Sequence, residues 1–327
     1  MYPLELIRTV RLMTDVCLEV SPDENVLCIT DTEENMDVMT LIAAECKARG
    51  AEAAVILLDR RKDHHHEPPR SIARAMKEAD VVIVMAFGAL MHTQARKEAC
   101  AAGVKYASVG TVTKEYLAKL DLKREDLLEV RALTEKIAQR LTLASSAHLT
   151  SRAGTDLRMS LEGRNGLALV PFGKKGTFCV LPDYAEAPCP PVEDSVEGVA
   201  VVDGTMVGTA DLEGIVEEPF EVHFEKGRIV KISEGKDARR LKNLLDTLEK
   251  EARIFAELGI NSNHKIPKRL TGTRLDDAIF GHVHLGLGRN DHIGGKTRAE
   301  THLDLLVTWA TLRLDGEAIL EDGDLKI

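Results

Sequence analysis

Short apolar runs alternate with amphipathic segments through the first third of the chain. The runs are rich in β-branched residues and almost continuously hydrophobic, as expected of strands buried on both faces of a parallel sheet. They lie at residues 25–30, 55–58, 80–85 and 104–109. Apolar residues at helical spacing predict helices over 4–20, 34–49 and 69–79. This alternation of strands and helices predicts an open α/β domain with right-handed crossovers.

The pattern changes after a charged amphipathic helix predicted at 123–143. The later segments alternate polar and apolar residues or carry turn signals, which is typical of antiparallel strands. These segments are 155–161, 177–181, 198–207, 220–232 and 313–321. One long helix is predicted at about 237–258, with Gly259 as its stop. We therefore predict an N-terminal Rossmann-like α/β domain at 1–145 and a C-terminal α+β metal-binding domain with an antiparallel sheet at 146–327.

Composition narrows the class of protein. The 327 residues include 43 basic and 53 acidic residues, for a net charge of -10. Nucleic-acid binders normally present a basic face, and a membrane span needs about 18 consecutive apolar residues; the sequence shows neither feature. The six cysteines form no CxxC pair, which favours reduced thiols. We expect a soluble cytoplasmic protein that binds no nucleic acid and no membrane.

Histidines gather near the C-terminus. Five of the eleven lie between residues 264 and 302: His264, His282, His284, His292 and His302. Strand alternation would place His282 and His284 on one face, and likewise Glu300, His302 and Asp304. A glycine-rich polar loop at 289–296 joins the two segments. Because imidazole is the commonest metal ligand, two such segments close together predict a metal site.

Nearby carboxylates could complete that site, although spacing alone leaves each of them open. Glu257 falls in the last turn of the predicted long helix, where a solvated charge is equally expected. Asp277 precedes the strand of His284 and could simply be a turn residue. Spacing does not single out Glu186. Residues 64–66, a run of three histidines before two prolines, are interpreted as a solvated loop.

Several motifs of the C-terminal half resemble the metallopeptidase family of aminopeptidases T and S. They are closer still to shorter relatives described as leucyl aminopeptidases or as 2,5-dihydroxypyridine dioxygenases. The motifs lie at 182–186, 191–198, 257–261, 275–277, 281–288, 294–295 and 301–304. The resemblance covers about half of the chain and rests on the order and spacing of these motifs.

The resemblance implies a metal-dependent, aminopeptidase-like hydrolase that cleaves a small amide or a peptide N-terminus. It implies metal contacts from Glu186, Glu257, His284, His302 and Asp304, with Asp277 as the acid preceding the strand. One or two ions of Zn, Co, Mn or Fe(II) would activate a water molecule. Glu186 or Glu257 would bridge the ions or accept the proton of that water.

Two other hypotheses remain open at this stage. His284, His302 and a carboxylate resemble the two-histidine, one-carboxylate pattern of a mononuclear Fe(II) ring-cleaving dioxygenase of the 2,5-dihydroxypyridine type. The third hypothesis is a non-catalytic relative with a degenerate site. In the catalytic readings the partner is a small-molecule or short-peptide substrate, and the resemblance implies a homo-oligomer.

Overall fold

The computed structural model describes residues 3–33, 36–60, 67–91, 93–110, 112–209 and 211–327. The run of histidines at 64–66 lies outside these ranges. The chain divides into two compact units. The first comprises Met1–Glu129 and Val170–Tyr184, and the second comprises Val130–Leu169 and Ala185–Ile327. No helix among the described residues is both long and apolar enough to cross a membrane.

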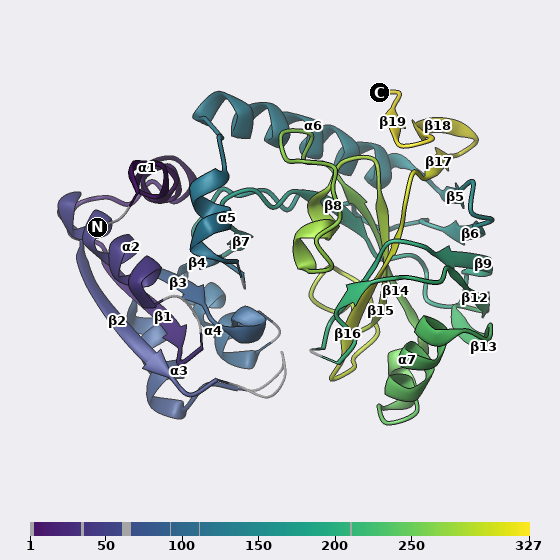
Figure 1. The fold of residues 1–327 in the computed structure, drawn as a ribbon, viewed down its shortest axis with the longest axis horizontal. Helices are drawn as coiled ribbons and strands as arrows, with labels where there is room; N and C mark the ends of the chain where they lie inside the picture. The colour runs from purple at the N-terminus through teal and green to yellow at the C-terminus, as the bar shows by residue number, and fades with distance from the viewer. Residues whose placement is uncertain (1–2, 34–35, 61–66, 92, 111, 210) are drawn as a thin grey trace. The chain divides into compact units, whose positions relative to one another are not determined.

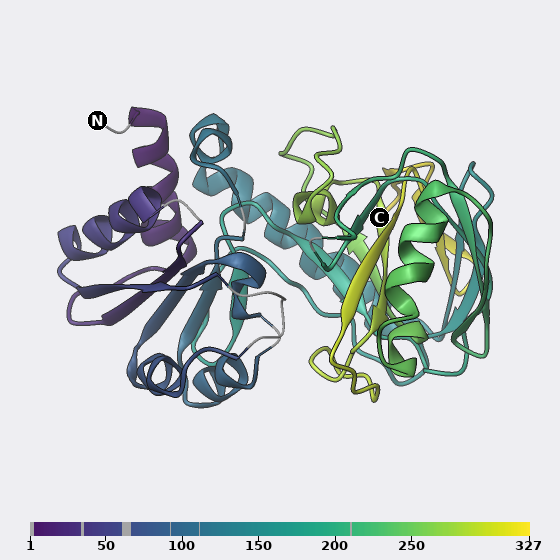
Figure 2. The ribbon, with the colours of Figure 1, turned by 60° about the horizontal axis from the view of Figure 1, so that its bottom comes forward.

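The first unit is built on a parallel sheet with strand order β2-β1-β3-β4-β7. Its strands are β1 (Asn25–Asp31), β2 (Glu52–Leu58), β3 (Val81–Met85), β4 (Lys105–Ser108) and β7 (Phe178–Val180). Its helices are α1 (Leu4–Arg11), η1 (Leu12–Cys17), α2 (Met36–Ala48), α3 (Arg70–Glu78), η2 (Phe87–Leu90), α4 (Gln94–Ala101) and α5 (Lys114–Lys119). Figure 2 shows α1 and α2 on one face of the sheet and α3 and α4 on the other. This arrangement confirms the predicted Rossmann-like half.

Strand β7 corrects one prediction about this sheet. Residues 177–181 were expected among the antiparallel strands of the second half. Instead β7 pairs in parallel with β4, with Tyr106 opposite Phe178. A strand of three residues is too short to carry a period of its own, so its pairing is decided by where the returning chain places it.

The second unit contains two antiparallel sheets, and their facing sides form one core (Figure 1). The first sheet has the order β11-β10-β16-β15-β14-β8, with β8 (Glu186–Cys189), β10 (Thr205–Val207), β11 (Gly214–Ile215), β14 (Phe255–Asn261), β15 (Val283–Gly288) and β16 (His302–Val307). The second has the order β13-β12-β9-β6-β5-β17-β18-β19, with β5 (Ser146–Thr150), β6 (Asp156–Ser160), β9 (Glu197–Val202), β12 (Phe220–Glu225), β13 (Arg228–Ile232), β17 (Thr311–Leu314), β18 (Glu317–Glu321) and β19 (Asp324–Leu325). These sheets confirm the predicted α+β architecture.

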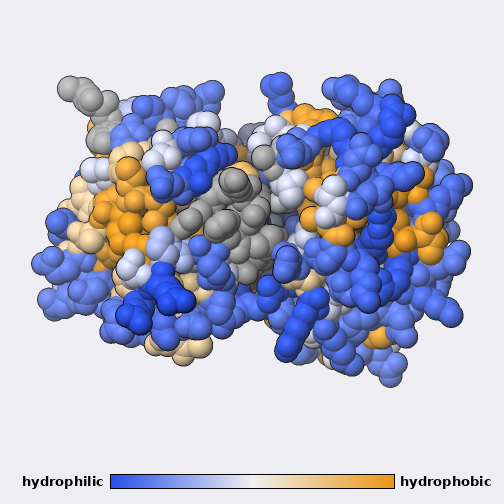
Figure 3. Space-filling model, turned by 90° about the horizontal axis from the view of Figure 1, so that it is seen from below, coloured by the Kyte–Doolittle hydropathy of each residue, from blue (hydrophilic) through white to orange (hydrophobic). Residues whose placement is uncertain are grey.

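Helices supply the rest of that core. Ile137 and Leu141 come from α6 (Arg124–Leu143), and Leu241 and Leu245 from α7 (Lys236–Leu245). Short helical turns lie at η3 (Lys250–Arg253) and η4 (Arg274–Ala278). On the face drawn in Figure 3 the surface is mostly hydrophilic, with apolar residues gathered in a few patches. Apolar side chains from both sheets and both helices thus make up the core of the second unit.

The single helix predicted over 237–258 is wrong. Helix α7 ends at Leu245, a short turn follows, and the chain then enters strand β14. All seven residues of β14 are buried, and the strand is paired on both sides, with β15 and with β8. This pairing overrides the local helical pattern. As a result, Glu257 lies in the middle of a central strand and not at a helix end.

Candidate metal centre

Three neighbouring strands place polar side chains on one face of the first sheet. Glu257 of β14 is paired with Gly286 of β15, which is paired in turn with Asp304 of β16. Residues directly opposed in an antiparallel sheet project to the same face. His284 and His302 lie on this face too, two residues from Gly286 and Asp304 along their own strands. Leucines at the alternate positions point into the core: Leu258, Leu285, Leu303 and Leu305.

Two glycines make room for the imidazole rings. A Cβ atom added to Gly259 would lie 2.0 Å from Nε2 of His284. One added to Gly286 would lie 2.6 Å from Cβ of Glu257 and 3.0 Å from Cε1 of His302. The distances of 2.0 Å at Gly259 and 2.6 Å at Gly286 are too short for any side chain to fit without displacing these neighbours. The sheet therefore accommodates the ring of His284 over Gly259, and keeps Glu257 next to His302, because both glycines lack a Cβ.

Ion pairs link these polar side chains into one buried network. Nε2 of His284 lies 3.1 Å from Oε2 of Glu186 and 3.3 Å from Oε1 of Glu257. The other oxygen of Glu257 lies 3.5 Å from Nε2 of His302, which lies 3.1 Å from Oδ1 of Asp304. None of the five residues is more than 9% exposed. Glu257 thus bridges two imidazoles, and each imidazole also faces a second carboxylate.

In both imidazole rings Nδ1, the nitrogen that does not face the carboxylates, donates a hydrogen bond to a neutral acceptor. Nδ1 of His284 donates to Oδ1 of Asn261 over 2.7 Å, while the amide nitrogen of Asn261 donates to the carbonyl of Asp276. Nδ1 of His302 donates to the carbonyl of Arg289, also over 2.7 Å. With the proton held on Nδ1, each Nε2 is directed at the carboxylates. Metal-binding histidines commonly have this arrangement.

The carboxylates decide the protonation of both rings. Burial lowers the pKa of His302, but Asp304 and Glu257 outweigh it and raise the pKa to about 9. For His284 burial likewise opposes the charge, and the facing Glu186 and Glu257 raise the pKa well above its usual range. Without a metal ion, protonated imidazoles thus balance part of the buried negative charge. A divalent cation could take over that role.

Asp277, at the end of the η4 turn, adds a further buried carboxylate. Among the described residues neither of its oxygens has a hydrogen-bond partner. Burial raises its pKa well above the usual range, and its charge interacts with those of His284, Asp304 and Glu186. A buried carboxylate without a donor costs free energy unless a cation or proton satisfies it. The donors and this orphaned carboxylate therefore fit a divalent metal ion.

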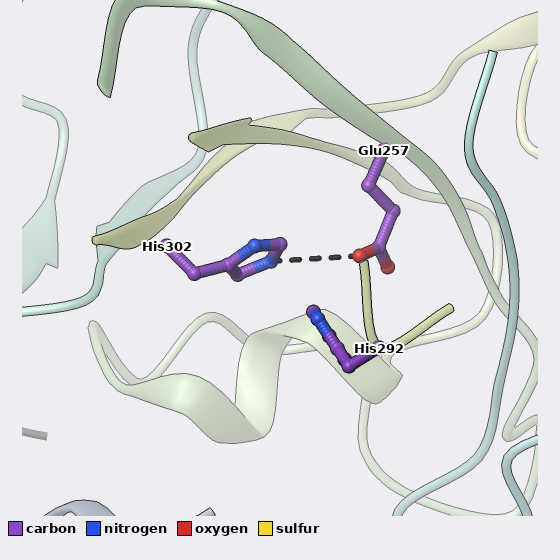
Figure 4. A group of neighbouring side chains, drawn as sticks. All are labelled: Glu257, His292 and His302. Carbon is purple, nitrogen blue, oxygen red and sulfur yellow. Dashed lines mark ion pairs between the residues drawn. The ribbon is translucent and has the colours of Figure 1, made fainter. Parts of the chain in front are cut away.

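Sequence analysis missed His292 as a candidate ligand. Donor atoms of Glu257, His292 and His302 all lie within 4.8 Å of one another, as do those of Glu186, Glu257 and His284. Figure 4 shows the ring of His292 beside the ion pair of His302 and Glu257. The ring centroids of the two histidines are 5.5 Å apart. His292 belongs to the cluster of five histidines, but a loop has no periodicity that could show where it points.

Three polar residues of the same region lie outside this group. His282 precedes β15, accepts a hydrogen bond from the backbone N–H of Trp309, and packs edge-on against its ring. Burial lowers the pKa of His282 to about 4. His264 packs against Phe280, and Glu300 is exposed ahead of β16. The expectation that His282 and Glu300 join the polar face is therefore wrong, because both lie before their strands begin.

The fold and this centre define a class: a two-unit protein with a buried cluster of imidazoles and carboxylates suited to a divalent metal. The sequence model of the 2,5-dihydroxypyridine 5,6-dioxygenase family matches residues 5–327. The chain belongs to this family. It is 24% identical over 278 residues to the 2,5-dihydroxypyridine 5,6-dioxygenase of Pseudomonas putida KT2440, covering 77% of this chain and 72% of that protein.

Two solved structures share the whole fold. The 2,5-dihydroxypyridine dioxygenase of Pseudomonas putida KT2440 superposes with a TM-score of 0.83 at 18% identity, over 99% of this chain and 96% of the other. AmpT of Thermus thermophilus superposes with a TM-score of 0.77 at 19% identity, over 99% of both chains. At these identities the likeness shows the fold alone.

The comparisons overturn the first of the sequence-based hypotheses. The predicted aminopeptidase-like hydrolase is wrong, because the family match over residues 5–327 and the curated relative both carry the dioxygenase description. The suspected family group is correct on its dioxygenase side. The predictions of a metalloenzyme and of a divalent metal cofactor are confirmed by the family together with the donor set.

Proposed function

We propose that the protein is a mononuclear Fe(II) dioxygenase that opens the ring of 2,5-dihydroxypyridine or of a closely related hydroxylated pyridine. One observation carries the proposal: Glu257, His292 and His302 converge within 4.8 Å in a chain that matches the dioxygenase family. Two imidazoles and one carboxylate form the ligand set typical of non-haem iron oxygenases. His302 and the carboxylate come from central strands, and His292 comes from the loop that follows β15.

Glu257, His292 and His302 would hold the ion. Iron(II) held there would supply the chemistry of oxygen activation, with coordination positions left open for substrate and dioxygen. Asp304 lies 3.1 Å from Nε2 of His302, and in the metal-free protein the charge of His302 outweighs burial and lowers the pKa of Asp304. Asp304 therefore restrains the imidazole of His302 from the side opposite the Arg289 carbonyl.

Glu186 and His284 form a proton-holding pair beside this set. Nε2 of His284 faces Glu186, and the amide of Asn261 fixes the other nitrogen of the ring. Hydroxyl groups on a substrate ring must give up or share a proton when they bind next to a cation. A buried imidazole whose Nε2 lies 3.1 Å from a carboxylate oxygen is placed to pass a proton between that carboxylate and a bound substrate. We assign Glu186 and His284 this acid–base role.

The test is oxygen uptake by anaerobically prepared protein loaded with Fe(II) and supplied with 2,5-dihydroxypyridine. We expect one dioxygen consumed per substrate, with both atoms of labelled dioxygen appearing in the ring-opened product. His302→Gln and Glu257→Gln should lower the rate by about 100-fold or more, as loss of a ligand does. His148→Gln is the matched control, because His148 pairs with Asp156 on the other sheet. Fully iron-loaded protein that leaves the substrate and the oxygen unchanged would refute the proposal.

A further inference from the structure

We propose that Asn290 is a positioning residue that sets His292 opposite Glu257 and His302. The inference rests on the ligand set of the proposed function and adds the residue that makes the set possible. His292 lies on the loop between β15 and β16, where no strand pairing fixes its side chain. Something else must therefore hold this loop against the strand of Glu257.

The side chain of Asn290 joins that loop to that strand. It is completely buried. Its Oδ1 accepts a hydrogen bond from the backbone N–H of Thr297 over 2.8 Å, and its Nδ2 donates to the carbonyl of Ala256 over 3.1 Å. Ala256 is the residue immediately before Glu257. A single amide thus fixes both ends of the loop relative to the carboxylate that His292 must face.

The main chain of Asn290 closes the loop around His292. The Asn290 N–H donates to the carbonyl of Thr297, and its own carbonyl accepts from Ile293 and Gly295. The loop also packs tightly on the amide, because a Cβ added to Gly295 would lie 2.2 Å from Cγ of Asn290. The loop segment that contains His292 is therefore closed by hydrogen bonds that all involve Asn290. A change at Asn290 should move His292 before it moves the strands.

A second anchor keeps the loop attached when Asn290 is changed. Arg164 donates to the carbonyl of Gly294 and pairs with Glu193, whose other oxygen accepts from the N–H of Lys296. These bonds hold the outer end of the loop and do not reach Ala256. Replacing Asn290 should thus leave a folded loop whose histidine is no longer fixed against Glu257.

Cobalt(II) is the probe, because its visible absorption responds to the number and type of ligands. Metal-free wild type, Asn290→Ala, His292→Ala and the double variant are each titrated with Co(II). We expect N290A and H292A to weaken binding by about 10- to 100-fold and to give similar altered spectra. In the H292A background, N290A should add less than about a twofold loss, because residues that act together are not additive. Asn243→Ala, on the exposed face of α7, is the matched control and should bind like wild type.

The outcomes separate this inference from the function it rests on. Additive losses in the double variant, or wild-type binding by N290A, would overturn the positioning role alone. Wild-type binding by H292A would remove His292 from the ligand set, and with it the proposed function. If N290A does not fold, Asn290→Asp takes its place, since it keeps the acceptor for Thr297 and loses the donor to Ala256. The same spectra and the same non-additivity are then expected.

Discussion

Replacing Gly259 by alanine tests the claim that the sheet is shaped around His284. The new Cβ would lie 2.0 Å from Nε2 and 2.1 Å from Cε1 of the ring. Gly259 is not among the residues with positive φ, so alanine suits its backbone. The three closest clashes are all with the imidazole, so the ring has to leave its place.

The cost follows from what the ring leaves behind. Overpacking a buried site costs about 1–3 kcal/mol. Moving the ring also breaks its 2.7 Å hydrogen bond to Asn261, and a buried polar group left without a partner costs about 1–3 kcal/mol more. Gly259→Ala should therefore lower the free energy of unfolding by roughly 2–6 kcal/mol. It should also weaken metal binding, since the displaced ring would no longer position Oε1 of Glu257, a proposed ligand.

Urea unfolding followed by tryptophan fluorescence measures this effect. Trp309 is the only tryptophan and belongs to the same unit as Gly259. Gly316→Ala is the control, because a Cβ there meets nothing within 4 Å and only the backbone at φ +88° is strained. It should cost about 1–2 kcal/mol and leave cobalt binding unchanged. If Gly259→Ala unfolds and binds cobalt like wild type, the glycine does not shape the site.

Two further predictions concern protons. Burial raises the pKa of Asp183 to about 6, although Tyr116 donates a hydrogen bond to its carboxylate. Because this pKa is higher in the folded than in the unfolded protein, ionisation of Asp183 lowers the free energy of unfolding as pH rises from about 4 to 6. Calorimetry should show Asp183→Asn more stable than wild type at pH 7, by at most about 3 kcal/mol, and equal to it below pH 4; a constant difference would contradict this. Because His302 has a pKa of about 9, divalent metal binding at pH 7 should release protons from His302 and His284. Titration calorimetry in two buffers of different ionisation enthalpy measures this release, and equal heats would contradict it.

The parts of the fold that sequence predicted well are those whose pattern is set by burial alone. Strand β3 is a continuous apolar run and β1 contains one at residues 26–29, because both faces of a parallel sheet are covered. Helix α6 starts within one residue of its predicted position, because its amphipathic repeat is long and regular. In these segments the local pattern and the tertiary contacts favour the same structure.

Predictions failed where distant contacts decide the structure. Residues 255–258 lie close to a helical repeat, yet β15 pairs along them and β8 pairs from Leu258 onward, which makes the segment a strand. The acidic side chain of Glu257 was therefore assigned to a solvated helix end when it belongs to the buried centre. Glu186 likewise had no local signal, and its place follows from the pairing of β8 beside Asn261.

The sequence-based choice of a hydrolase fails for a related reason. Strand alternation can reveal His284, His302 and Asp304, but buried carboxylates and imidazoles around a cation serve hydrolysis and oxygenation alike. On the proposed function, the ligand that separates the two chemistries is His292, which adds a second imidazole to Glu257 and His302. Its position depends on a loop hydrogen bond to Ala256, through Asn290, and not on any periodic pattern. A site whose deciding ligand is held by such a loop can be located from sequence, but that ligand can be assigned only once the contacts of the loop are known.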